Sequence, residues 1–226
     1  MVDTSFLDKG ILLGYCFTVH THHEKCEEYL SDADAVFYVT KYIDDVYEEK
    51  KREVIKQHRT AILDHITRLK RADEFSEELD PDDIDEIRRW MITTANDAWR
   101  YLRDYYDGLS YTTVRDVEND LRSLARELDK LTRRRKEKFD SRVESWTRDR
   151  EYPGLEDNLG DLKQEEEEDY WVCIDAHDLA CRTPGTTELV TNNPSDFGEQ
   201  AYGSVIKQVT DIDKIRILVA NPTTKA

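Results

Sequence analysis

The middle of the chain is almost free of the residues that interrupt helices. Between residues 46 and 150 there is one glycine, Gly108, and one proline, Pro81. Both residue types destabilise helix interiors, so their scarcity favours long helices. Apolar residues recur there at helical spacing in three stretches, Val54–Leu69, Ile84–Tyr105 and Val114–Leu131. The last stretch follows a strict three-four alternation, which is typical of a coiled-coil seam.

The few turn-forming residues of this middle part divide it into a helical hairpin. Pro81 suits the first turn of the second helix, with Asp80 as its cap. Gly108 and Ser110 separate the second helix from the third, and residues 152–154 are expected to end the third. The acidic run that follows, from Glu165 to Asp169, reads as a charged linker. We therefore predict a helical insertion over residues 51–165.

The two ends of the chain follow a different rhythm, in which strands alternate with helices. Expected strands are one just before Asp8, then Ala35–Thr40, Tyr170–Ile174, Glu188–Thr191 and Ile215–Ala220. Helices are expected after Asp8, near His22, near Tyr42 and over Ala176–Arg182. Such alternation implies a parallel sheet sandwiched by helices. The predicted fold is thus an α/β domain, made of residues 1–50 and 166–226 and interrupted by the coiled-coil-like hairpin.

Charge is the clearest feature of the composition. Fifty acidic residues against 33 basic ones give a formal net charge of −17. Dense surface carboxylate keeps a protein hydrated, and salt screens its self-repulsion. The balance resembles that of proteins from salt-loving archaea; the alternative is an ordinary acidic cytosolic protein. It argues against broad binding of polyanions but leaves room for a local basic site.

The spacing of the cysteines and the length of the apolar runs indicate a cytoplasmic protein. The four cysteines form no CxxC pair, which disfavours a zinc ribbon or a thioredoxin-like motif. The longest apolar run, Gly10 to Val19, is too short to span a bilayer, and no signal peptide is visible. We therefore expect a cytoplasmic protein without a membrane partner.

Acidic and amide side chains follow the expected strands. They are Asp8, Asp44, Asp45, Asp175, Asn193 and Asp196. Ligands of parallel sheets bind beyond the carboxyl ends of the strands, where these side chains would converge. Converging carboxylates repel one another unless a cation neutralises them, and hard oxygen ligands select Mg²⁺ or Mn²⁺. Such an ion supports attack of water on a phosphodiester; the alternative is that these residues cap helices.

Two segments of the chain resemble a known family. Phe6-Leu-Asp-Lys-Gly-Ile-Leu-Leu-Gly14 is similar to the opening motif of PIN-domain ribonucleases. Asp175-Ala-His-Asp-Leu-Ala180 and Leu189-Val-Thr-Asn-Asn-Pro-Ser-Asp-Phe197 are similar to the closing motif, which places one acid before a helix and further acids in the turn after a strand. The resemblance covers roughly residues 1–50 and 168–220. It implies a parallel α/β sandwich, a Mg²⁺ or Mn²⁺ site and cleavage of single-stranded RNA.

The resemblance assigns roles to individual residues. Asp8, Asp175 and Asp196 become the catalytic acids that bind metal, and Asn193 joins the metal shell at a position that is often Asp. The acid that the family carries on a helix has no clean match. Asp45 is our choice as the fourth catalytic residue, followed by Asp44 and then Glu48.

Two features depart from the family pattern near the first acid. Lys9 stands where the family usually has a small hydroxyl residue, so a cation beside the metal site would either weaken metal binding or contact phosphate. The segment Asp3-Thr-Ser-Phe-Leu7 also resembles the opening motif. Too little chain precedes Asp3 to form a strand, so we favour Asp8 as the first acid.

The only dense basic cluster is Arg133, Arg134, Arg135 and Lys136. Together with Lys9 it is our candidate nucleic-acid interface. The alternative is a solvated helix face paired with neighbouring glutamates.

Two functions follow from these observations. The first is a metal-dependent ribonuclease whose helical insertion positions RNA. The second is a non-catalytic scaffold whose seam binds another helix or a second copy of the chain. Some PIN-domain proteins are toxins, so the resemblance also implies a toxin–antitoxin pair with an antitoxin-like partner.

Overall fold

The computed structural model describes residues 2–18, 20, 22–71, 77–93, 102 and 105–219. The backbone forms two compact units. The first consists of Met1–Cys16, His20–Tyr47 and Arg135–Ala226, and the second of Phe17–Val19 and Glu48–Arg134. Two long helices, α3 (Ile43–Leu69) and α6 (Val114–Asp140), each contain residues of both units.

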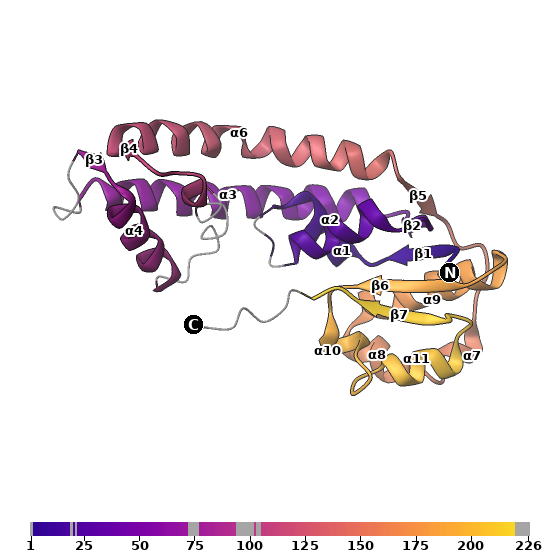
Figure 1. Cartoon of the computed structure of the whole chain (residues 1–226). Coiled ribbons are helices and arrows are strands. Elements are labelled where there is room, and N and C mark those ends of the chain that lie inside the picture. The colour runs from indigo at the N-terminus through magenta and orange to yellow at the C-terminus, as the bar shows by residue number, and fades with distance from the viewer. Residues whose placement is uncertain are drawn as a thin grey trace. The chain divides into compact units, whose positions relative to one another are not determined.

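The first unit is built on a five-stranded sheet in the order β5-β2-β1-β6-β7 (Figure 1). Its strands are β1 (Thr4–Leu7), β2 (Val36–Thr40), β5 (Val143–Trp146), β6 (Thr187–Thr191) and β7 (Lys214–Ile217). Every pair of neighbours is parallel, so all five carboxyl ends lie along one edge. The central strands β1 and β6 are buried along their whole length. The expected α/β class with a parallel sheet is therefore confirmed.

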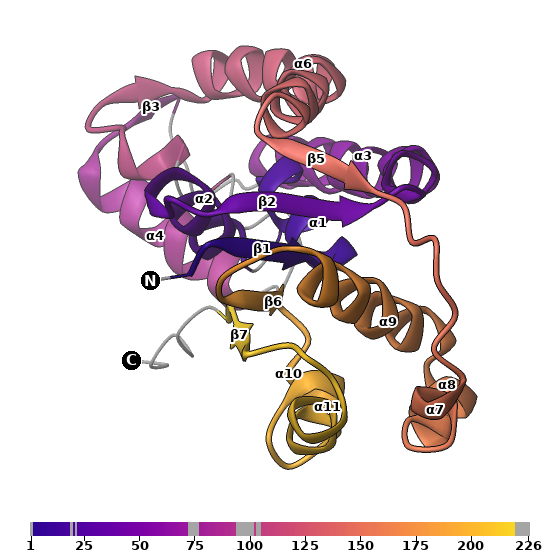
Figure 2. The ribbon, with the colours of Figure 1, turned by 90° about the vertical axis from the view of Figure 1, so that its right-hand side faces the viewer.

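Helices cover both faces of this sheet. They are α1 (Lys9–Cys16), α2 (His23–Asp32), α7 (Pro153–Glu156), α8 (Gly160–Glu165), α9 (Glu167–Arg182), α10 (Pro194–Phe197) and α11 (Gly203–Val209). Phe6 and Leu189 share a core with residues of α7, α8, α9 and α11, and Figure 2 shows α9 alongside the sheet. Ser5 alternates to the other face, where its hydroxyl lies 2.8 Å from the Tyr29 hydroxyl of α2. The site described below lies at the carboxyl edge of this sandwich.

The predicted strand Tyr170–Ile174 is wrong, because these residues form part of helix α9. Short apolar runs fit a buried strand and a buried helix equally well. Here the helix is favoured by acids in its first turn, Glu167 to Asp169, which interact favourably with the positive end of the helix dipole. Asp175 consequently lies within a helix and not at the end of a strand.

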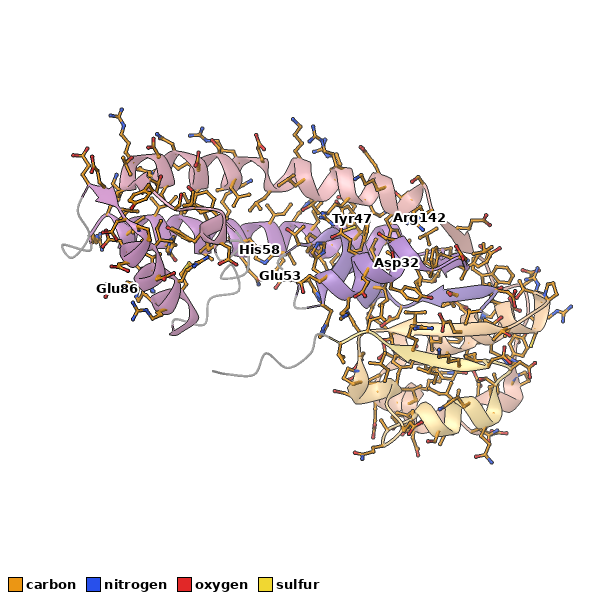
Figure 3. The ribbon with its side chains drawn as sticks, viewed as in Figure 1. Asp32, Tyr47, Glu53, His58, Glu86 and Arg142 are labelled. Carbon is orange, nitrogen blue, oxygen red and sulfur yellow. The ribbon has the colours of Figure 1, made fainter. Side chains whose placement is uncertain are left out.

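The predicted end of the insertion is also wrong. Helix α6 ends at Asp140, and β5 then pairs with β2 from Phe37↔Val143 to Thr40↔Trp146. Arg142 lies at the turn between them (Figure 3). Its guanidinium carbon is 5.7 Å from the centre of the Phe37 ring. The second unit thus stops at Arg134 and not at residue 165. Strand β5 has only four residues and follows a charged helix directly, so the alternation of apolar and polar residues that identifies a strand cannot be recognised there.

The second unit is a helical assembly with a two-residue antiparallel ribbon. It contains the adjoining parts of α3 and α6, helix α4 (Pro81–Thr93), and strands β3 (Glu78–Leu79) and β4 (Thr112–Thr113). Residue numbers rise along α3 while those of their partners on α6 fall. The contacts are Lys51 with Asp129 at 3.4 Å, Arg59 Nε with the Ala125 carbonyl at 3.0 Å and, just after α3, Lys70 with Glu118 at 3.0 Å. The two helices are therefore antiparallel.

Apolar residues on the inner faces of these helices form the core of the second unit. Val117, Leu121 and Leu128 of the predicted seam are buried there, against α3 and α4 residues such as Ile62 and Ile87. On α3, the side chain of Glu53 is exposed, whereas that of His58 is buried. Both residues are labelled in Figure 3. The seam therefore packs within its own unit.

The expected start of α4 is confirmed. Asp80 Oδ1 accepts hydrogen bonds from the backbone N–H groups of Asp82 and Asp83, at 2.9 and 3.0 Å. These bonds satisfy two of the donors that a helix start leaves unpaired. The expected continuation of this helix through Ala95 and Ala98 lies outside the described residues. None of the helices in the part of the chain that is described is long and apolar enough to cross a membrane.

The core of the second unit gives a prediction about stability. Leu121 is fully buried, so Leu121→Ala should lower the free energy of unfolding by about 2–5 kcal/mol. Leu124→Ala, three residues along the same helix at a half-buried position, is the matched control and should cost less. Urea unfolding of the full chain, followed by helical circular dichroism, measures both. Equal losses would contradict the assigned core.

Candidate functional site

Asp8 follows β1 at the centre of the sheet and is almost fully buried, with 2% exposure. Its Oδ2 atom accepts a hydrogen bond from the Thr191 hydroxyl at 2.8 Å. Its Oδ1 atom is buried and has no hydrogen-bond partner among the described residues. Burial raises the pKa of the Asp8 carboxyl, although the bond from Thr191, the charge of Lys9 and the backbone N–H groups of Lys9 and Gly10 act in the opposite direction. The Asp8 carboxyl is therefore only partly compensated for its burial.

Asp169 lies beside this group, in the first turn of α9, and is also buried. Asn193, which follows β6, donates from its amide nitrogen to Asp169 Oδ2 at 3.0 Å and to the carboxylate of Asp196. The backbone N–H of Asn193 donates in turn to the Thr191 hydroxyl at 3.0 Å. The side chains of Asp8, Thr191, Asn193, Asp169 and Asp196 thus form one connected set, which we call the acid cluster.

The carboxylates of the acid cluster repel one another. Burial raises the pKa of Asp169 to about 7, and the charges of Asp8 and Asp196 contribute to the increase. Carboxylates held this close in a poorly solvated place favour either a shared proton or a cation. At neutral pH the cluster therefore favours binding of positive charge.

Lys9 is the protein's own cation at this position. Its Nζ lies 3.6 Å from Asp169 Oδ1 and also pairs with Glu168. Burial acts to lower the pKa of Lys9, but the hydrogen bond to Glu168 and the charge of Asp169 outweigh it and raise the pKa. Lys9 therefore stays protonated and offsets part of the negative charge.

A glycine contact fixes the loop after β6 against the start of α1. The Asn192 amide donates to the Gly10 carbonyl at 2.8 Å, and a Cβ at Gly10 would collide with the Asn192 side chain. Gly10 therefore allows the close approach that holds Asn193 next to Asp8.

The structure brings together three of the sequence-predicted site residues, Asp8, Asn193 and Asp196. Asp175 is placed differently: it accepts a hydrogen bond from Arg148 Nε at 3.0 Å and lines a neighbouring cavity. Of the candidate helix acids, Asp45 is exposed on α3, while Asp44 pairs with Lys136 at 2.6 Å. Glu48 belongs to the second unit.

Asp169 is the acid that the sequence reasoning missed. The sequence predicts a charged linker at this position, because the apolar residues that follow also fit a strand. A helical reading of residues 170–182 puts Asp169 in the first helical turn, on the same helix as Asp175. The signal was therefore present but depended on the secondary structure assigned to its neighbours.

The basic cluster is largely paired within the protein. Arg133 pairs with Asp129 at 2.6 Å. Arg135 donates to Glu27 and to the Tyr15 carbonyl, and Lys136 contacts both Asp44 and Asp140 at 2.6 Å. Arg134 is exposed. Arg135 and Lys136 thus hold the end of α6 against α1, α2 and the start of α3, which reduces the charge they can offer to nucleic acid.

A second group of potential ligands is His177, Cys181 and Asp211, whose ligand atoms lie within 4.8 Å of one another. The backbone N–H of Asp211 donates to His177 Nδ1 at 3.0 Å, so Nε2 carries the proton of the neutral ring. Burial and the neighbouring Asp211 raise the pKa of Cys181 to about 11. The Cys181 thiol donates to Asp211 Oδ2 at 3.0 Å, so the members of this group are hydrogen-bonded to one another.

Comparisons with known proteins give no match: no family model, no curated protein and no solved structure is similar to this chain. The acid cluster is therefore interpreted from its own geometry.

The raised pKa of Asp169 gives a prediction about pH. Between the ordinary value of 3.8 and about 7, the folded protein binds the Asp169 proton more tightly than the unfolded chain does. Stability from this group therefore falls as pH rises through that range. Asp169→Asn keeps the acceptor for Asn193 and removes the charge, so without divalent ions it should melt several degrees above wild type at pH 8, with a smaller difference at pH 5.

The control for this measurement is Asp45→Asn, which removes a carboxylate from an exposed position. It should show no comparable gain between pH 5 and pH 8. A melting temperature of Asp169→Asn that stays at or below wild type at pH 8 would contradict the assigned environment.

Proposed function

We propose that this chain is a divalent-metal-dependent ribonuclease with a PIN-like fold, and that it cleaves single-stranded RNA at the acid cluster. The observation that carries the proposal is the buried, unpartnered Oδ1 of Asp8, which lies in the same cluster as Asp169 and Asp196. A core carboxylate oxygen without a hydrogen bond is costly unless a ligand occupies the space beside it.

The order of the elements supports the PIN-like part of the proposal. One acid follows the central strand β1, another begins the helix that precedes β6, and Asn193 and Asp196 follow β6. We interpret the second unit, residues 48–134, as the helical insertion between β2 and β5. The motif acid that was first assigned to Asp175 is better assigned to Asp169.

The donor set suits a hard cation. Asp8, Asp169 and Asp196 supply carboxylate oxygens, which Mg²⁺ and Mn²⁺ prefer. When bound, such an ion would neutralise these charges and assist attack of water on a phosphodiester. Asn193 would orient two of the carboxylates through its amide, while Thr191 holds Asp8. Asp175 would have an indirect role, because its carboxylate positions Arg148.

Lys9 has two opposing effects in this proposal. As a fixed cation 3.6 Å from Asp169 it competes with a bound metal ion, and it also offers a partner for a phosphate of the RNA. The first effect predicts weak metal binding, so that activity needs a high metal concentration.

The alternative function, a scaffold that acts through the seam of the insertion, has less support. Val117, Leu121 and Leu128 of that seam are buried in the core of the second unit. An antitoxin-like partner and a homodimer stay predictions of the resemblance alone.

Cleavage assays test the proposed function. With Mn²⁺ and a mixed-sequence single-stranded RNA, Asp169→Asn and Asp8→Asn should each lower kcat/KM by about 100-fold or more, since even residues that only support a metal ligand contribute about 10–100-fold. Asp45→Asn should retain activity, because that residue is exposed on α3. Equal cleavage by wild type and Asp169→Asn would overturn the assigned site.

Metal binding can be measured without activity. A bound ion stabilises the folded state by about 2.7 kcal/mol at a concentration one hundred times its dissociation constant. At pH 8, Mn²⁺ should raise the melting temperature of Lys9→Ser more than that of wild type, whereas Lys9→Arg keeps the competing charge and should resemble wild type. If Mn²⁺ shifts neither wild type nor Lys9→Ser, the cluster does not bind the ion.

A further inference from the structure

A cavity of about 470 Å³ lies in the first unit, at the carboxyl ends of β2 and β5. This volume falls within the range of about 300–1,000 Å³ that is typical of sites for small ligands. Lys9 and Glu168 line the cavity, and they are also the residues that contact or adjoin Asp169. The cavity therefore opens beside the acid cluster, on the same edge of the sheet.

Three aromatic side chains line this cavity: Tyr42, Trp146 and Trp171. Trp171 and Trp146 are half-buried, while Tyr42 is 58% exposed. The indole N–H of Trp146 donates to the buried Asp178 at 2.9 Å, which fixes that ring. The cavity thus has a rigid aromatic wall together with an exposed aromatic side chain.

Cationic groups accompany the aromatic wall. The Arg148 guanidinium carbon lies 4.9 Å from the centre of the Trp171 ring, and its Nε is held by Asp175 at 3.0 Å. Lys41 and Lys9 also line the cavity, as do the acids Glu168 and Asp175, which pair with Lys9 and Arg148. Lys41 forms no ion pair among the described residues, and its Nζ lies 4.8 Å from the centre of the Tyr42 ring, so it is the cation that this wall can offer to an anion.

We propose that this cavity, the aromatic pocket, binds an unpaired nucleobase of the RNA whose scissile phosphate is cleaved at the acid cluster. The inference rests on the proposed function and specifies its substrate. Unstacked bases bind to proteins by stacking on Trp and Tyr, and the adjoining phosphates pair with Lys and Arg. A base within a duplex is already stacked, so the pocket selects single-stranded RNA.

The pocket also gives a role to Asp175, which the sequence motif singled out. By holding Arg148 at 3.0 Å, Asp175 fixes the guanidinium against the Trp171 ring. It is a positioning residue for the base site and does not belong to the metal site. Loss of its charge should therefore affect KM more than kcat.

Binding of a fluorescently labelled, short single-stranded RNA, measured by anisotropy in EDTA, tests the pocket. Stacking contributes about 1–3 kcal/mol per base, so Trp171→Ala should raise Kd about 5- to 100-fold. Trp171→Phe keeps an aromatic face and should restore most of the affinity. Tyr42→Ala, at an exposed position that can be changed without loss of core packing, should also weaken binding.

Trp90→Ala is the matched control, because Trp90 belongs to α4 in the second unit and does not line the pocket. It should leave Kd unchanged. Trp146 is unsuited to the test since its indole holds the buried Asp178.

The outcomes separate the pocket from the proposed function. Unchanged Kd in both Trp171→Ala and Tyr42→Ala, with cleavage that still depends on Asp169, would overturn the pocket alone. Binding that depends on Trp171 without metal-dependent cleavage would support the pocket and overturn the nuclease. Absence of RNA binding by the wild-type chain would overturn the pocket.

Discussion

The parallel pairing of β1 with β6 is the constraint on which the rest of the site depends. Phe6 pairs with Leu189 and Leu7 with Val190, and the backbone N–H of Asp8 then donates to the Val190 carbonyl at 2.9 Å. This register places the Asp8 carboxylate against the Thr191 hydroxyl. A shift of one residue would turn Asp8 to the opposite face of the sheet and separate it from the side chains that follow β6.

Two buried acids at this sheet, Glu188 and Asp8, differ in how their carboxylates are satisfied. Glu188 on β6 is 1% exposed, and its carboxylate is satisfied by the protein itself: Tyr29 donates to it, Arg216 contacts it at 3.0 Å and Lys214 lies 3.8 Å away. Asp8 is equally buried, but its Oδ1 has no such partner among the described residues. The chain therefore satisfies the Glu188 carboxylate with ion pairs and hydrogen bonds, whereas Asp8 has the Thr191 hydroxyl, the nearby charge of Lys9 and the backbone N–H groups of Lys9 and Gly10.

The residues of the acid cluster could be predicted from the sequence only where the neighbouring apolar pattern was long enough to identify a strand or a helix. Residues next to clear strands, such as Asp8, Asn193 and Asp196, could be placed correctly because the carboxyl ends of parallel strands converge. Asp169 and the β5 strand could not be placed. The apolar run 170–174 fits two secondary structures, and β5 spans only four residues. Tertiary packing decides both cases: α9 buries the run against the sheet, and β2 supplies the partner for β5.

Metal binding by the acid cluster is tested most directly by the anomalous signal from crystals of the protein grown or soaked with Mn²⁺. We expect a peak beside Asp8 Oδ1, within coordination distance of Asp169 or Asp196, and its loss in crystals of Asp8→Asn. A well-ordered acid cluster without a peak, or a peak only at His177, Cys181 and Asp211, would contradict this expectation.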